Sequence, residues 1–217
     1  MLASEVSSAV DRSLDGLRLL SHPFYRSWQD GLLADRDLAL YAEQYRHFER
    51  SLPDVLSAVA GDLPAGEARS LVLQNLDDES SKPEPHVKLF EGFADAVGAR
   101  PGSDAAPATR DLVGVYAEAA KLGPVPALAV IAAYEVQAGD IATTKAGSLR
   151  ERYGLTSEAT RFWDVHSEME GAHADWTVEA LNILRADPDV VAEWSGRSAK
   201  AWWSFLDDQL DCSTVAS

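Results

Sequence analysis

The stretch HSEMEGAHADW, residues 166–176, places two histidines and a glutamate where they could bind one metal ion. On an α-helix, His166, Glu170 and His173 occupy positions i, i+4 and i+7, so their side chains project from one face. Such a face can present several ligands to one ion, but the same spacing also occurs on solvated helices that carry an i, i+4 pair. The triplet alone leaves both interpretations open.

Glu135 lies in the apolar stretch AVIAAYEVQA. A carboxylate buried there without a partner would be costly or would take up a proton. A bound cation is one of the few arrangements that keeps such a carboxylate ionised. An ion pair with Lys145 or Arg110 is the alternative.

The segment DDESSKPEPH offers a second acid and imidazole, Glu79 and His86, seven residues apart. Pro83 and Pro85 make an unbroken helix between them unfavourable. We therefore expect Glu79 at the end of one helix and His86 in the first turn of the next. The alternative is a merely exposed turn.

Together these segments supply three carboxylates and three imidazoles in three helical regions. Imidazole and carboxylate ligands without thiolate suit iron or manganese, and six ligands would serve two ions. The predicted metal ligands are Glu79, His86, Glu135, His166, Glu170 and His173.

The elements that must position these side chains are helical nearly throughout, and no convincing alternating strand is found. The pattern predicts an all-α bundle of about eight helices, with a kink near Pro53 and the apolar segment 127–154 in its centre. The expected helices cover residues 7–20, a short stretch up to Gly31, and 34–63, 65–79, 86–97, 110–122, 127–154, 157–187 and 192–211.

Length and composition indicate one domain over residues 1–217, with 210–217 as a flexible tail. The formal net charge of −16 argues against nucleic acid and anionic membranes as partners. The N-terminus has no signal-peptide pattern, and no apolar run approaches the roughly 20 residues that span a bilayer. The single Cys212 rules out a disulfide within one chain. We expect a cytoplasmic protein.

The ordered set Glu-x6-His, Glu, His-x3-Glu-x2-His resembles the ligand pattern of haem-oxygenase-like di-iron oxidases, of the TenA/PqqC-like fold group. The segments HPFYRSWQDGLLADRDLALYAEQYRHFERSLPDVLSAV and ARSLVLQNLDDESSKPEPHVKLFEGF are similar to one branch, the CADD-like self-sacrificing p-aminobenzoate synthases. The similarity covers about residues 14–210. It implies a haem-oxygenase-like bundle with two iron ions, or iron and manganese, that uses O2 and an external reductant. We also expect a homodimer.

In that branch the aromatic ring derives from a tyrosine of the protein itself, and a lysine is implicated as amino donor. The matching positions are Tyr25 and Lys145, and Tyr41 matches a further aromatic position, as do Tyr45 and Tyr134. The resemblance thus implies that Tyr25, Tyr41 and Lys145 are catalytic.

Two positions depart from the pattern of a chlamydial member of that branch. Glu170 replaces an aspartate, which keeps a hard oxygen ligand, and Gly139 replaces a proline. Ten residues of straight helix span about 15 Å, so we expect a break at Gly139 to bring Lys145 towards metals held at Glu135. The alternatives to catalytic roles are that Tyr25 is an ordinary packing aromatic and that Lys145 lies on the surface.

Three functions remain open from the sequence. The first is production of p-aminobenzoate, a folate precursor, from Tyr25. The second is the same metal chemistry on a free small molecule, such as an amino acid or a fatty acid. The third is a partner-binding protein without catalysis. A TenA-like thiaminase fits less well, because the only thiol lies in the expected tail.

Overall fold

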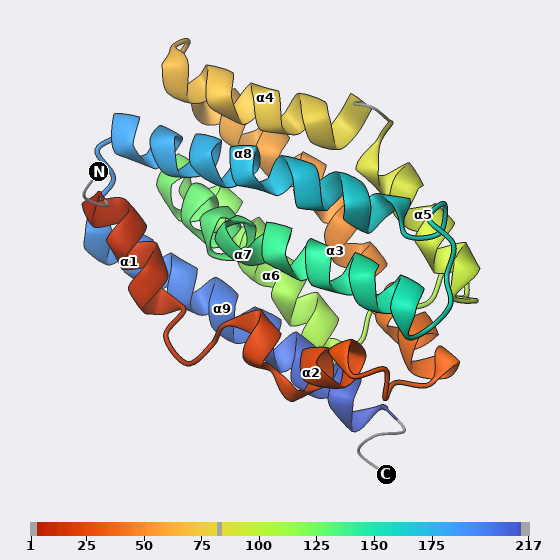
Figure 1. The fold of residues 1–217 in the computed structure, drawn as a ribbon. Coiled ribbons are helices and arrows are strands. Elements are labelled where there is room, and N and C mark those ends of the chain that lie inside the picture. The colour runs from red at the N-terminus through yellow and green to blue at the C-terminus, as the bar shows by residue number, and fades with distance from the viewer. Residues whose placement is uncertain (1–3, 82–83, 214–217) are drawn as a thin grey trace.

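The computed structural model describes residues 4–81 and 84–213, which fold into nine α-helices and one short 3-10 helix, without a strand in those ranges (Figure 1). The all-α prediction is therefore confirmed. The elements are α1 (Glu5–Ser13), η1 (Leu19–Ser21), α2 (Pro23–Gln29), α3 (Asp35–Asp62), α4 (Glu67–Ser81), α5 (His86–Ala96), α6 (Pro107–Leu122), α7 (Pro124–Glu151), α8 (Arg161–Ile183) and α9 (Pro188–Asp211).

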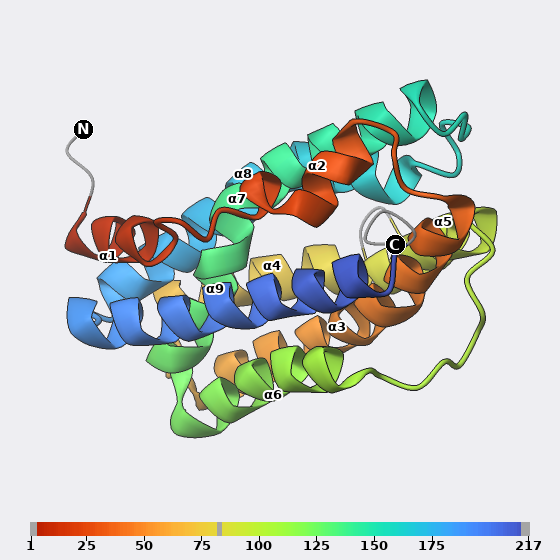
Figure 2. The ribbon, with the colours of Figure 1, turned by 90° about the horizontal axis from the view of Figure 1, so that it is seen from below.

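Helix α7 forms the centre of the bundle, as its apolar sequence predicts. Gly123, at φ 118°, separates it from α6, and Pro124 starts it at a position where a missing N–H costs nothing. Every residue from Ala127 to Glu135 is buried. Helix α7 packs along α8 and α9, and Figures 1 and 2 show it between them.

By length and composition alone, α7 could cross a membrane, although the sequence was expected to contain no such stretch. In the structure 72% of its apolar window is buried against other helices. The apolar side chains therefore serve the bundle core, as in the central helix of a globular domain.

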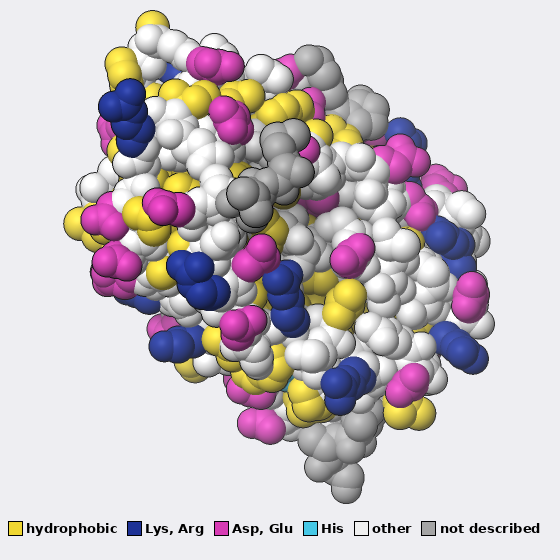
Figure 3. All heavy atoms as spheres, turned by 60° about the vertical axis from the view of Figure 1, so that its left-hand side comes forward, with side chains coloured by type: hydrophobic (Ala, Val, Ile, Leu, Met, Phe, Trp, Pro, Cys, Tyr) yellow, Lys and Arg dark blue, Asp and Glu magenta, His cyan; other side chains and the backbone are white. Residues whose placement is uncertain are grey.

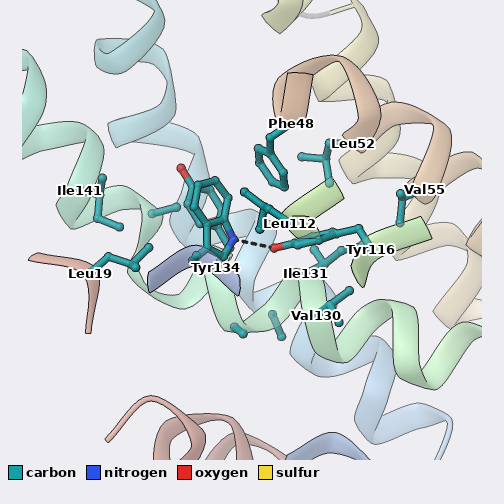
Figure 4. Packing of buried hydrophobic residues seen from close by; sticks show 14 of the residues in the cluster. Leu19, Phe48, Leu52, Val55, Leu112, Tyr116, Val130, Ile131, Tyr134 and Ile141 are labelled. Carbon is teal, nitrogen blue, oxygen red and sulfur yellow. Dashed lines mark hydrogen bonds between the residues drawn. The ribbon is translucent and has the colours of Figure 1, made fainter. Parts of the chain in front are cut away.

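Aromatic rings fill much of the space between α3, α6, α7 and α9. Trp202 stacks on Tyr134 at a centroid distance of 4.5 Å and contacts Phe48 edge-on at 4.6 Å. Its indole N–H donates to the Tyr116 hydroxyl at 3.0 Å (Figure 4). The aromatic segment near the C-terminus thus packs in the core and holds α3 and α7 at a defined separation.

The first predicted helix is too long. Helix α1 ends at Ser13, and Gly16 takes the left-handed conformation at φ 73°, which breaks the helical path before η1. Helix α3 continues through Pro53 as one helix. At the other end of the chain α9 runs to Asp211, so the expected tail begins later than residue 210, and 214–217 lie outside the described residues.

On the face seen in Figure 3, acidic and basic side chains lie among apolar groups. Four large apolar side chains are more than a third exposed among the described residues: Leu32, Leu73, Leu122 and Ile183.

The expected break at Gly139 is wrong, because α7 is one helix from Pro124 to Glu151. A Cβ at Gly139 would lie 3.6 Å from the Glu170 Cβ, an ordinary van der Waals contact. Gly139→Ala should therefore increase the free energy of unfolding by about 0.5–1 kcal/mol, since alanine lowers the entropic cost of a regular helix. Chemical denaturation measures this. A loss of stability would show instead that residue 139 acts as a hinge. The matched control is Gly147→Ala, because Gly147 lies in the same helix with open space around it.

Candidate metal centre

Four buried side chains from four helices converge beside α7. Glu49 comes from α3, Glu79 from the last turn of α4, His86 from the first residue of α5 and His166 from α8. One potential ligand atom from each lies within 4.8 Å of the others. These residues lie on four separate helices, so they meet only because the helices pass one another at the same level of the bundle.

Glu79 and His86 form the best-defined contact of this group. The His86 Nδ1 donates to the Glu79 carboxylate at 2.9 Å, which leaves the His86 Nε2 free to bind a metal. Burial alone would raise the pKa of Glu79, but the hydrogen bond from His86 and the nearby imidazoles outweigh it and lower that pKa. Glu79 is therefore the carboxylate of the cluster that keeps its charge most readily.

His166 is oriented in the same way by its own helix. Its Nδ1 donates to the Phe162 carbonyl at 2.9 Å, so its Nε2 faces the cluster, 3.8 Å from a Glu170 oxygen. Burial, together with the neighbouring His86, lowers the pKa of His166 to about 3. The imidazole is neutral at physiological pH, which is the state that binds metals.

Glu170 and His173 extend the cluster on the same face of α8. The His173 Nδ1 lies 3.6 Å from a Glu79 oxygen and 3.9 Å from a Glu170 oxygen, and its Nε2 lies 3.5 Å from Asp78. Burial, with repulsion from the other carboxylates, raises the pKa of Glu170 well above its usual range. The structure thus brings the three residues of the 166–173 triplet to one buried side of the helix.

Glu135 is buried beside this group and receives a 2.7 Å hydrogen bond from the Asn75 amide, while its second oxygen has no partner among the described residues. Burial raises its pKa, against the opposing effects of His173, Thr177 and Asn75. The alternative ion pairs are wrong. Lys145 contacts tyrosines, and Arg110 bonds to the Ala105 carbonyl.

The buried ligand atoms that make no hydrogen bond fit a metal site. Within the described ranges, several buried ligand-type atoms have no hydrogen-bond partner, and such atoms are costly unless something binds them. They are Glu49 Oε1, His86 Nε2, Glu135 Oε2, Glu170 Oε2 and both ring nitrogens of His173.

Sequence analysis overlooked Glu49. It is 2% exposed and lies on the buried face of α3 with Tyr41, Tyr45 and Leu52. Its position four residues after Tyr45 and three before Leu52 is the available signal, because an acid on the apolar stripe of a helix must have a partner, a proton or an ion. Asn75, the donor to Glu135, has no comparable signal.

A second buried group contains Tyr25, Tyr41 and Lys145. The Tyr25 and Tyr41 hydroxyls are 2.9 Å apart, and the Lys145 Nζ donates to the Tyr41 hydroxyl at 2.5 Å. The same nitrogen lies 4.0 Å from the centre of the Trp163 ring and 4.5 Å from that of Tyr25. Lys145 is 1% exposed, so the surface-lysine alternative is wrong.

Burial lowers the pKa of Lys145 well below its usual value and raises the pKa of Tyr25. Burial therefore favours the uncharged forms of both groups, a free amine and a phenol. The unbroken α7 directs Lys145 to the tyrosines rather than to the glutamate and histidine cluster.

Aromatic rings connect the two groups. Trp163 contacts the Lys145 nitrogen and packs on Phe162, with their ring centroids 4.7 Å apart. Phe162 in turn packs on His166 at a centroid distance of 4.0 Å. Tyr45 stacks on Tyr41 at 5.5 Å and contacts Trp163 at 5.6 Å. Two rings of α8 thus separate the lysine from the nearest imidazole.

Comparison with known proteins identifies the class. Residues 39–202 match the family described as iron-containing redox enzymes. The fold is haem-oxygenase-like. A TenA homologue from Pseudomonas syringae superposes with a TM-score of 0.83 over 95% of this chain and 93% of that one, at 13% identity. A CADD-like protein from Nostoc punctiforme gives 0.76 over 96% of each chain, at 14% identity.

Among curated relatives, the 4-aminobenzoate synthase of Nitrosomonas europaea is 33% identical, over 95% of this chain and 92% of that protein. The 4-aminobenzoate synthase of Chlamydia trachomatis is 29% identical, over 96% and 93%. The chain therefore belongs to the family of iron-containing redox enzymes and is an oxidoreductase. The resemblance to haem-oxygenase-like and CADD-like proteins is confirmed, while the roles of the individual residues remain predictions.

The buried carboxyls predict a pH-dependent metal affinity. Because the pKa values of Glu135 and Glu170 are raised, the metal-free protein holds protons that a cation must displace. The affinity for Mn²⁺ should therefore fall as the pH is lowered from about 8 to about 6, with protons released on binding. Calorimetry in two buffers of different ionisation enthalpy measures this release. An affinity constant across that range would contradict it.

Proposed function

We propose that this protein forms 4-aminobenzoate from its own Tyr25, with Lys145 as the amino donor and a dinuclear iron or iron–manganese site in the glutamate and histidine cluster. The two 4-aminobenzoate synthases support the product, since the similarity spans nearly the whole of each chain. The observation that carries the proposal is the contact of a buried lysine, whose pKa is lowered by burial, with a pair of bonded tyrosines.

The residues that would hold the metals are Glu79, His86, Glu135, His166, Glu170 and His173, which are buried near one another in the bundle interior. Metals bound there would supply the oxidising power for the reaction by activating O2, with electrons from an external reductant. The surrounding helices exclude water from this volume, because all six side chains are buried.

Tyr25 would supply the aromatic ring. It is 1% exposed and is fixed by Phe24, Trp28 and Tyr41, whose rings contact it at 6.1–6.4 Å. His22 caps the short helix α2 that carries it, by accepting from the Phe24 N–H and bonding to Asp207. The reacting ring is therefore held in one orientation.

Tyr41 would connect the ring to the amine. Its hydroxyl bonds to both the Tyr25 hydroxyl and the Lys145 nitrogen, so a proton that leaves Tyr25 can pass through Tyr41 to the neutral amine. The depressed pKa of Lys145 keeps its lone pair available until then.

The intact mass of the chain tests self-sacrifice. After anaerobic loading with Fe(II) and exposure to O2 with a reductant, we expect a mass change in the peptide that contains Tyr25. At most one 4-aminobenzoate should form per chain. Tyr25→Phe should bind metal as the wild type does and form no product. Tyr116→Phe, an equally buried tyrosine bonded to Ser198 and Trp202, should leave the yield unchanged.

An unchanged mass with O2 consumed would reject Tyr25 as the substrate. It would favour oxidation of a free small molecule at the same site. A metal-free preparation that stays folded, consumes no O2 and binds a protein partner would favour the non-catalytic alternative.

Lys145→Met should abolish the product and stabilise the fold. In the unfolded chain the lysine is charged at pH 7, whereas its folded pKa is depressed, so burial of the amine costs stability that methionine does not cost. We expect the free energy of unfolding to rise by about 1 kcal/mol or more at pH 7, after loss of the bond to Tyr41.

Thermal unfolding of both proteins measures this difference, which should shrink as the pH rises towards 10.5, the ordinary lysine pKa. A difference independent of pH would show that Lys145 is already charged in the folded protein. Product formation by Lys145→Met would exclude the lysine as amino donor.

A further inference from the structure

Glu49 is a buried carboxylate that the six-ligand pattern leaves without a role. Its side chain is 2% exposed, and its Oε1 has no hydrogen-bond partner among the described residues. Such a group must be protonated or must bind a cation. In the metal-free protein, burial and the nearby charge of Glu79 raise the pKa of Glu49.

The geometry favours a cation. Glu49, Glu79, His86 and His166 are the four residues whose ligand atoms lie within 4.8 Å of one another. Two carboxylates and two imidazoles at this separation would supply four protein ligands to one first-row ion, with none from α7. Without Glu49, this position would hold only three protein ligands.

The remaining ligands form a second group around His173. Its Nδ1 faces oxygens of Glu79 and Glu170, and Glu135 lies beside it. Glu79 belongs to both groups, because one of its oxygens bonds to His86 while the other faces His173. Glu79 would therefore contribute to both metal positions.

The charge balance of the buried volume gives an independent argument. Two divalent cations carry four positive charges, whereas the six ligands of the sequence pattern carry three negative charges. Glu49 supplies the fourth. Because an uncompensated charge is costly in a protein interior, a neutral set of seven ligands is more stable than a set with one excess positive charge.

We propose that Glu49 is a seventh metal ligand and that, with Glu79, His86 and His166, it forms the tighter of two metal positions. This inference rests on the proposed dinuclear site. It assigns the second, weaker position to Glu135, Glu170 and His173, with Glu79 shared.

Metal binding by Glu49→Gln tests the inference without any measurement of activity. The variant keeps the shape of the side chain and removes the charge. Anaerobic titration with Mn²⁺ should give two ions per wild-type chain. In the variant the tighter binding step should weaken at least about tenfold, so that only one ion is bound at the Mn²⁺ concentration that just fills both positions of the wild type. The electron paramagnetic resonance spectrum should change from that of a coupled pair of ions to that of a single ion.

Glu43→Gln is the matched control. Glu43 is an equally buried carboxylate six residues earlier in α3, but it bonds to Arg100 and Ser103, away from the cluster. It should bind two ions with wild-type affinity. Circular dichroism of both metal-free variants shows whether they fold, and Glu49→Asp, which shortens the ligand, should restore the second ion at reduced affinity.

The outcomes separate the two proposals. Two ions bound by Glu49→Gln, with wild-type affinity and spectrum, would overturn the role of Glu49 and leave the dinuclear site intact. A folded wild-type chain that binds no Mn²⁺ and no Fe(II) would overturn the dinuclear site and the inference together.

Discussion

The constraint on which the rest of the structure depends is the burial of four carboxylates and three imidazoles with no lysine or arginine from the described residues among them. Glu49, Glu79, Glu135 and Glu170 come from four different helices and are each at most 5% exposed. Without an ion, burial and mutual repulsion raise the pKa values of three of them, and only Glu79, bonded to His86, has a lowered pKa. A cluster of buried carboxylates is unfavourable for folding, so its presence in the folded protein indicates a function in binding cations.

The bundle makes this interior possible by keeping its other contacts apolar and rigid. Aromatic rings between α3, α7 and α9 set the spacing of these helices, and α7 is buried along its first half. Each imidazole of the tighter group is oriented through its other ring nitrogen, His86 by Glu79 and His166 by the Phe162 carbonyl. The donor atoms are thus directed inward before any ion arrives, which lowers the entropic cost of binding.

The same framework separates two kinds of chemistry while keeping them close. The carboxylate and imidazole group favours cations, whereas the lysine and tyrosine group is enclosed by rings, and its burial favours the uncharged amine. Helix α8 serves both, since Trp163 covers Lys145 and His166 lies one turn further on.

The sequence by itself determined which residues could share a helix face. Spacing along one helix follows from 3.6 residues per turn, so the 166–173 triplet, the buried position of Glu135 and the helices around Glu79 and His86 could be predicted. Contacts between helices were decided only by the tertiary structure, because they depend on crossing positions that no local pattern encodes. Glu49 therefore went unnoticed, Lys145 was expected to reach the metals through a break at Gly139, and the first helix was drawn past Gly16. Whether a lysine is solvated or buried is a property of the packed molecule, and here packing buries Lys145 beside Tyr41 rather than leaving it on the surface.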